Sequence, residues 1–88
     1  MQYMLNPAIE ITTLDDGDSV AFDPAIGDTH FLNSTGSDIL RLLSEEPKDL
    51  EALIQGLKAE YDADTDTIRA DVEPFLEEFI QKSILMQI

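Results

Sequence analysis

The stretch that decides the fold reads Phe22-Asp23-Pro24-Ala25-Ile26-Gly27-Asp28-Thr29-His30-Phe31-Leu32-Asn33. It holds a short apolar run, a turn and a second apolar run. Pro24 is typical of the start of a turn, and Gly27 can adopt the positive φ that a tight turn often requires. Asn33 or Ser34 can then cap a helix through a side-chain oxygen. The stretch therefore predicts two strands, joined by a tight turn and followed at once by a helix.

The residues before this stretch predict a third strand. Ile9, Ile11 and Thr13 alternate with more polar neighbours, which is the period of a half-buried strand. The turn signal Asp15-Asp16-Gly17-Asp18 separates this run from the run that begins at Val20. Three short strands joined by two tight loops predict an antiparallel meander.

The rest of the chain favours three helices, and apolar residues recur in it at helical spacing. The apolar positions are Ile39, Leu40, Leu42 and Leu43, then Leu50, Leu53, Ile54, Leu57 and Tyr61, then Ile68, Val72, Phe75, Leu76, Phe79 and Ile80. Pro47 ends the first helix, and Asp49 is a candidate cap for the second. Pro74 predicts that the third helix either kinks there or begins near Asp71. The residues Ile84–Ile88 predict a short extended tail.

The predicted fold class is α+β and winged-helix-like, with a three-stranded antiparallel N-terminal sheet followed by three helices. A chain of 88 residues is long enough for one hydrophobic core and too short for two. We therefore expect a single domain over residues 1–88.

The charge balance excludes several partners. The chain has 19 acidic residues against 5 Lys and Arg, which gives a formal charge of -14. Nucleic acids and anionic lipids would repel such a domain, so we expect neither a nucleic-acid nor a membrane partner. The excess charge is explained by solubility, or by attraction of a basic partner.

The chain has no cysteine, which excludes disulfides and thiolate catalysis. Its N-terminus lacks the basic and apolar segments of a secretion signal, and no run approaches the roughly 20 apolar residues of a membrane span. The expected location is the cytoplasm.

The sequence offers no catalytic constellation. His30 is the only histidine, and no nucleophile or carboxylate partner for it can be identified. We therefore predict that the protein is not an enzyme, and that it has no catalytic residues and no cofactor.

One acidic segment has the spacing of a calcium loop. Residues 62–73 place Asp at positions 1, 3 and 5 and Glu at position 12. Position 6 should be Gly and is Thr67, and position 8 is usually apolar and is Arg69. The preferred interpretation is an acidic turn in which Asp66 or Thr67 caps the next helix, with no metal site.

At the level of its whole pattern, the sequence resembles the PqqD-like family. Residues 22–33 resemble the strand–turn–strand–Asn signature of that family, and the apolar spacing of all three helices is similar. The closing Ser83-Ile84-Leu85 resembles the usual Gly-Leu-Leu or Gly-Leu-Ile ending, with Ser in place of Gly. The resemblance covers about residues 8–86. The most similar variants are stand-alone peptide chaperones found beside kinase-related proteins or in lasso-peptide gene clusters.

This resemblance implies a RiPP recognition element, which is a non-catalytic peptide chaperone. Such a protein binds the leader of a ribosomally synthesised precursor peptide as an extra strand on its third strand, against its third helix. It then presents the peptide to a modifying enzyme, such as a radical SAM enzyme, a peptidase or a cyclase. The alternative is a winged-helix regulatory or protein-interaction domain without leader binding.

The expected peptide-binding residues follow from that mode, because an edge strand is a template for a foreign strand. They are Thr29, His30, Phe31 and Leu32 on the edge, and Arg69, Val72, Glu73 and Leu76 on the helix. The competing interpretation is that the apolar residues of the third helix belong to the core, which we favour for Val72 and Phe75. Two copies of the chain could also pair through the same edge as a homodimer.

Overall fold

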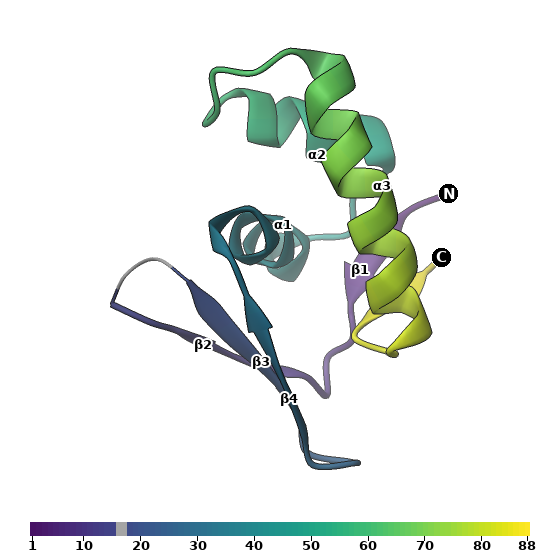
Figure 1. Ribbon diagram of the computed structural model, residues 1–88. Helices are drawn as coiled ribbons and strands as arrows, with labels where there is room; N and C mark the ends of the chain where they lie inside the picture. The colour runs from purple at the N-terminus through teal and green to yellow at the C-terminus, as the bar shows by residue number, and fades with distance from the viewer. Residues whose placement is uncertain (16–17) are drawn as a thin grey trace.

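The predicted sheet and helices are present in the computed structural model, which describes residues 1–15 and 18–88 (Figure 1). Strands β2 (Glu10–Thr13), β3 (Ser19–Asp23) and β4 (Asp28–Leu32) form an antiparallel sheet in the order β2-β3-β4. Helices α1 (Ser34–Glu45), α2 (Leu50–Lys58) and α3 (Thr65–Gln81) follow. The α+β, winged-helix-like fold class is confirmed.

The turn between β3 and β4 forms as its residues predict. Gly27 has a φ of 76°, and its N–H donates to the carbonyl oxygen of Asp23 at 2.7 Å. The side chain of Asp23 accepts from the backbone N–H of Ala25 at 3.0 Å, which fixes the start of the turn. The turn predicted at Asp16 and Gly17 lies outside the described residues.

A second, two-stranded sheet was not predicted from the sequence. Strand β1 (Tyr3–Leu5) pairs antiparallel with β5 (Leu85–Gln87), so that Met4 lies opposite Met86. The predicted extended tail is therefore a strand, and its partner is the N-terminal segment. Three residues are too few to show the period of a strand, which is why β1 escaped detection.

Side-chain caps begin all three helices. Asn33 accepts from the N–H of Gly36 at 2.9 Å and Asp49 from that of Ala52 at 2.8 Å, as predicted. The third cap is Asp64, which accepts from the N–H of Thr67 at 2.8 Å, so the prediction of Asp66 or Thr67 was wrong.

Helix α3 is one element with Pro74 inside it, so the predicted start near Asp71 was also wrong. Proline removes one backbone hydrogen bond from a helix. Val72 and Leu76, on either side of Pro74, are 0% and 2% exposed. Their burial against the core offsets the lost bond.

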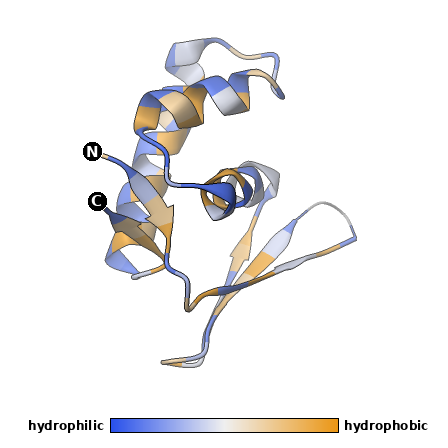
Figure 2. Cartoon of the chain, turned by 180° about the vertical axis from the view of Figure 1, so that it is seen from behind, coloured by the Kyte–Doolittle hydropathy of each residue, from blue (hydrophilic) through white to orange (hydrophobic). Residues whose placement is uncertain are grey.

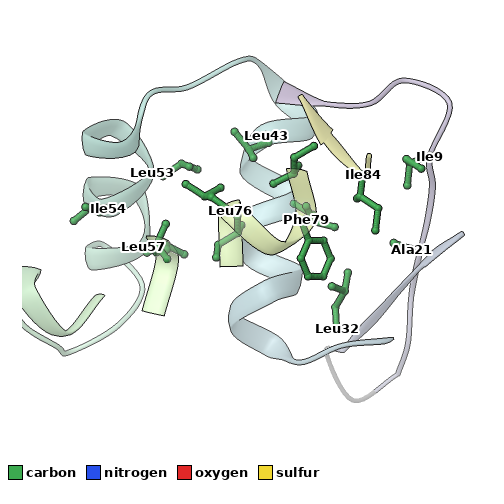
Figure 3. Packing of buried hydrophobic residues seen from close by; sticks show 14 of the residues in the cluster. Ile9, Ala21, Leu32, Leu43, Leu53, Ile54, Leu57, Leu76, Phe79 and Ile84 are labelled. Atoms are coloured by element: carbon green, nitrogen blue, oxygen red, sulfur yellow. The ribbon is translucent and has the colours of Figure 1, made fainter. Parts of the chain in front are cut away.

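The core lies between the sheet and the helices (Figure 3). Ala21 and Leu32 contribute from the sheet, Phe79 from α3, and Ile84 from the segment that leads into β5. Figure 1 shows the three helices on one side of the β2-β3-β4 sheet. None of the helices in the described part of the chain has the length and apolar character needed to cross a membrane.

Candidate functional site

Strand β4 forms one border of the three-stranded sheet. Its only partner strand within residues 1–15 and 18–88 is β3, where Val20 lies opposite Phe31 and Ala21 opposite His30. Its other side therefore carries backbone N–H and C=O groups that no described strand pairs with. This is the edge at which the sequence predicted peptide binding.

The side chains of β4 alternate between two environments, as strand geometry requires. Leu32 is 4% exposed and belongs to the core, whereas Phe31 is 79% exposed on the opposite face. His30 is half-buried on the same face as Leu32, and Thr29 is exposed beside Phe31.

A cavity of about 370 Å³ lies along this strand, between β4 and α3. Its lining residues are Thr29, His30, Phe31, Leu32, Asn33, Phe75, Glu78, Phe79 and Lys82. We call this cavity the β4–α3 groove. It brings all four predicted edge residues together with the C-terminal half of α3.

Aromatic rings form the helix wall of the groove. Phe75 and Phe79 stack with ring centroids 4.1 Å apart and planes inclined by 16°. His30 lies 6.5 Å from Phe79 between ring centroids, and the Nζ atom of Lys82 lies 5.2 Å from the Phe79 centroid. In Figure 3, Phe79 lies next to Leu32, which lines the same groove. The wall thus combines the aromatic rings with an ion pair, since Glu78 also lines the groove and its Oε1 atom lies 3.8 Å from Lys82 Nζ.

A glycine on α1 makes room for this wall. A Cβ atom built on Gly36 would lie 2.9 Å from the Cε2 atom of Phe75, closer than real carbon contacts allow. The absence of a side chain at position 36 therefore lets the first turn of α1 lie against the Phe75 ring.

The four predicted helix residues lie elsewhere. Val72 and Leu76 are buried in the core. The Nη2 atom of Arg69 lies 2.7 Å from Glu51 Oε1 of α2, and its Nη1 atom lies 3.9 Å from Glu73 Oε1. None of these four residues lines the β4–α3 groove.

The reason is helical geometry, since each residue turns the helix by about 100°. Phe75, which the sequence assigned to the core, is only partly buried and lines the groove. The signal that could have identified the wall is the pair Phe75 and Phe79 at i and i+4, because such residues share one helix face. Glu78 and Lys82 form a second i, i+4 pair there, with 3.8 Å between Nζ and Oε1.

The acidic segment before α3 serves as a helix start. Helix α3 begins at Thr65, so most of residues 62–73, which have the spacing of a calcium loop, are helical. Within the described residues, no group of three His, Cys, Asp or Glu side chains could hold a metal ion. Bonds from the backbone N–H and the side chain of Thr67 lower the pKa of Asp64, which fits its role as a cap.

A polar cluster away from the groove joins α1 to the end of α2. The Tyr61 hydroxyl donates to Asp38, and the Arg41 Nη2 atom lies 2.6 Å from Glu60 Oε1. Burial, followed by the bond to Asp38, raises the pKa of Tyr61. Each member has a partner within the chain, so we assign the cluster a structural role.

Comparison with known proteins places these features in a family. A search of curated proteins found no match. Among solved structures, the chain is similar to TbiB1 in complex with the TbiA(beta) leader peptide, at 27% identity and a TM-score of 0.85. The match covers 97% of this chain and 96% of TbiB1. The family model described as coenzyme PQQ synthesis protein D matches residues 18–85, so the chain belongs to the PqqD family.

Proposed function

We propose that residues 1–88 form one peptide-binding domain, which binds the leader of a ribosomally synthesised precursor peptide. The observation that carries this proposal is the unpaired edge of β4 beside an aromatic groove. The similarity to TbiB1, which was solved with a leader peptide, supports the same role. The domain acts without catalysis, as a carrier that presents the peptide to a modifying enzyme.

Two contributions hold the peptide in this proposal. Backbone groups of β4 from Thr29 to Leu32 bond to an extended leader segment, which becomes the fourth strand of the sheet. Every second side chain of that segment then points into the β4–α3 groove and packs on Phe75. The main-chain bonds supply affinity that is independent of sequence, and the groove supplies selectivity.

This proposal assigns the helix contacts differently from the sequence prediction. Phe75 and Lys82 replace Arg69, Val72, Glu73 and Leu76 as the helix side of the site, and the buried Phe79 supports Phe75 by stacking on its ring. Val72 and Leu76 are 0% and 2% exposed and offer a ligand almost no surface. Their substitution would act on peptide binding through the stability of the core.

The test is a titration of the isotope-labelled protein with the leader of the precursor encoded beside it. We expect amide shift changes confined to residues 28–33 and to α3 from Phe75 to Lys82. A peptide of the same composition in scrambled order is the control. Absence of binding at high micromolar concentration, or shifts centred on another surface, would refute the proposal.

Strand addition has a sharper signature than binding alone. In an added strand, alternate peptide amides face the receiving edge. Two leader peptides, N-methylated on alternate sets of amides, should therefore differ in affinity, and only one set should abolish binding. Equal binding of both would exclude strand addition.

A further inference from the structure

The sheet has a second face, which the helices leave open. The pairing register aligns its outward side chains in two cross-strand rows. One row is Thr12, Val20 and Phe31, and the other is Glu10, Phe22 and Thr29. We call these six residues the outer face.

The middle of the outer face is apolar. Val20 and Phe22 lie on the central strand β3, where neighbouring strands cover part of each side chain, and they are only half-buried. Phe31, on the edge strand, is 79% exposed. The hairpin turn beside them carries Ile26, which is 64% exposed. Figure 2 shows hydrophobic colour on these strands, while the helices lie on the other side of the sheet. Contiguous exposed apolar side chains on a small domain mark an interaction surface more often than single ones do.

The charges carried by the strands of this sheet and by their turns have one sign. Residues 1–32 contain no Lys or Arg, and their acidic residues are Glu10, Asp15, Asp16, Asp18, Asp23 and Asp28. Glu10 lies within the outer face, whereas Asp28, exposed at the start of β4, pairs with Asp23 and so belongs to the helix side of the sheet. The five Lys and Arg residues of the chain all lie after residue 40, in the helical part. The outer face is therefore an apolar centre on strands and turns that carry only acidic charges, and the nearest cation that shares a cavity with it is Lys82, which is paired with Glu78 in the β4–α3 groove.

We propose that the outer face docks the enzyme that receives the peptide, through an apolar patch of that enzyme bordered by Lys and Arg. This inference rests on the proposed function, since it assumes that a peptide is delivered. Charge complementarity selects the occupant, because opposite borders attract and like borders repel across an interface. A second copy of this chain would bring two acidic borders together, at a charge of -14 each.

The geometry also couples the two binding events. Phe31 lies on the edge strand and on the outer face at once. A leader added beside β4 would extend the sheet by one strand, and half of its side chains would join the outer face next to Phe31. The enzyme would then contact the domain and the bound leader together. It should therefore bind the loaded domain more tightly than the empty one.

The test uses the purified modifying enzyme encoded beside the precursor gene and the double variant Val20→Thr/Phe22→Thr. Threonine keeps a strand-forming side chain and removes apolar surface from the central strand, away from the β4 edge. We expect the affinity for the enzyme to fall by about tenfold or more, and leader affinity to stay within about twofold. The control is Met86→Thr/Ile88→Thr, which alters one exposed apolar residue of β5 and one directly after it, and should leave both affinities unchanged.

A second variant tests the charge argument without touching apolar packing, in case the first is unstable. Glu10→Lys, which reverses the charge within the outer face, should slow association with the enzyme and reduce its dependence on salt. The inference is refuted if both variants bind the enzyme like the wild type, if the wild type does not bind it, or if the outer face proves to be a dimer contact. If the wild type binds the enzyme but does not bind the leader, the proposed function is refuted, whereas the assignment of the outer face as the docking surface is retained.

Discussion

Phe75 and Phe79 stack one turn apart on α3, with ring centroids 4.1 Å apart, and both line the groove beside the free edge of β4. Phe79 is 4% exposed and Phe75 is partly buried, and stacking stabilises such an aromatic pair by about 0.5–1.5 kcal/mol beyond the burial of its area. The pair is therefore a preformed apolar wall, which an extended peptide can contact without rearranging the helix.

Phe75→Ala should remove half of that wall. We expect the dissociation constant for the leader peptide to rise by about tenfold or more, because aromatic anchors dominate such interfaces. The matched control is Ile80→Ala, a partly buried residue of α3 that lines a different hollow, next to Tyr3. Both variants should lose about 1–3 kcal/mol of unfolding free energy, since both expose apolar surface. Calorimetric titration measures the affinity for the leader, and urea unfolding measures the stability. An equal loss of affinity in both variants would contradict the assignment of Phe75 to the binding groove.

Gly36→Ala and Gly56→Ala should change stability in opposite directions. Replacing a helical Gly by Ala stabilises by up to about 1 kcal/mol if the methyl group fits. At Gly56 the methyl group would meet the Cδ1 atom of Leu42 at 3.1 Å, and this side-chain end can move by a few tenths of an ångström. At Gly36 it would meet the Phe75 ring at 2.9 Å, and the stack on Phe79 resists displacement.

We therefore expect Gly56→Ala to be neutral or stabilising, and Gly36→Ala to lower both the melting temperature and the affinity for the leader. Thermal unfolding followed by circular dichroism measures the melting temperature, and titration with the leader measures the affinity. A Gly36→Ala variant with higher stability and unchanged affinity would show that Phe75 is free to move.

The sequence predicted the fold from signals that act locally. The turn at Gly27 and the caps Asn33 and Asp49 depend on neighbouring residues only, so they are visible in the sequence. Pairing of Met4 with Met86 joins the two ends of the chain and has no local signature. The identity of the third cap, Asp64, could not be chosen among several acidic residues in a row.

The candidate site divides in the same way. The edge residues Thr29 to Leu32 came from the resemblance, which implies binding on the third strand, because the strand order leaves β2 as well as β4 at a border of the sheet. To predict the helix residues, one must know how α3 is oriented about its own axis. An apolar stripe that includes Val72, Phe75 and Leu76 does not show which side of the helix faces the core. Tertiary packing settles this, because Leu76 is 2% exposed whereas Phe75 lines the groove.

Ser83 occupies a backbone conformation that favours glycine. Its φ is 62°, at the turn that leads from α3 into β5. A left-handed conformation disfavours a residue with a Cβ atom by about 1–2 kcal/mol. Ser83→Gly should therefore stabilise the protein by up to about 1 kcal/mol after the greater entropy of glycine in the unfolded chain is allowed for. Ser83→Val should destabilise it, because a β-branched side chain tolerates this conformation least. Urea unfolding measures the unfolding free energy of both variants. A Ser83→Gly variant less stable than the wild type would contradict the argument that the conformation of Ser83 is strained.

The pairing of the two chain ends should contribute substantially to stability. Ile84 is fully buried where the chain enters β5, whereas Ile88 is 60% exposed at its end. Ile84→Ala should lower the unfolding free energy by about 2–5 kcal/mol, the range for a large aliphatic side chain deleted from a core. Ile88→Ala should change it by no more than about 0.5 kcal/mol. Similar small effects for both in chemical denaturation would mean that the ends of the chain are not packed as described.

Asp64→Ala should destabilise the protein at neutral pH and lose this effect in acid. Hydrogen bonds from Thr67 lower the pKa of Asp64 in the folded state, so its stabilising effect is complete above the unfolded pKa of about 3.9. That contribution disappears as the pH falls through the folded pKa, where both states hold the proton. The melting temperature of Asp64→Ala should thus lie below that of the wild type at pH 7, and the gap should narrow as the pH falls below the unfolded pKa of about 3.9. Asp62→Ala is the control, because it removes the same charge two residues away without uncapping α3. A gap that stays constant with pH, or an equal gap for Asp62→Ala, would show that the charge of the Asp64 cap does not stabilise the start of α3.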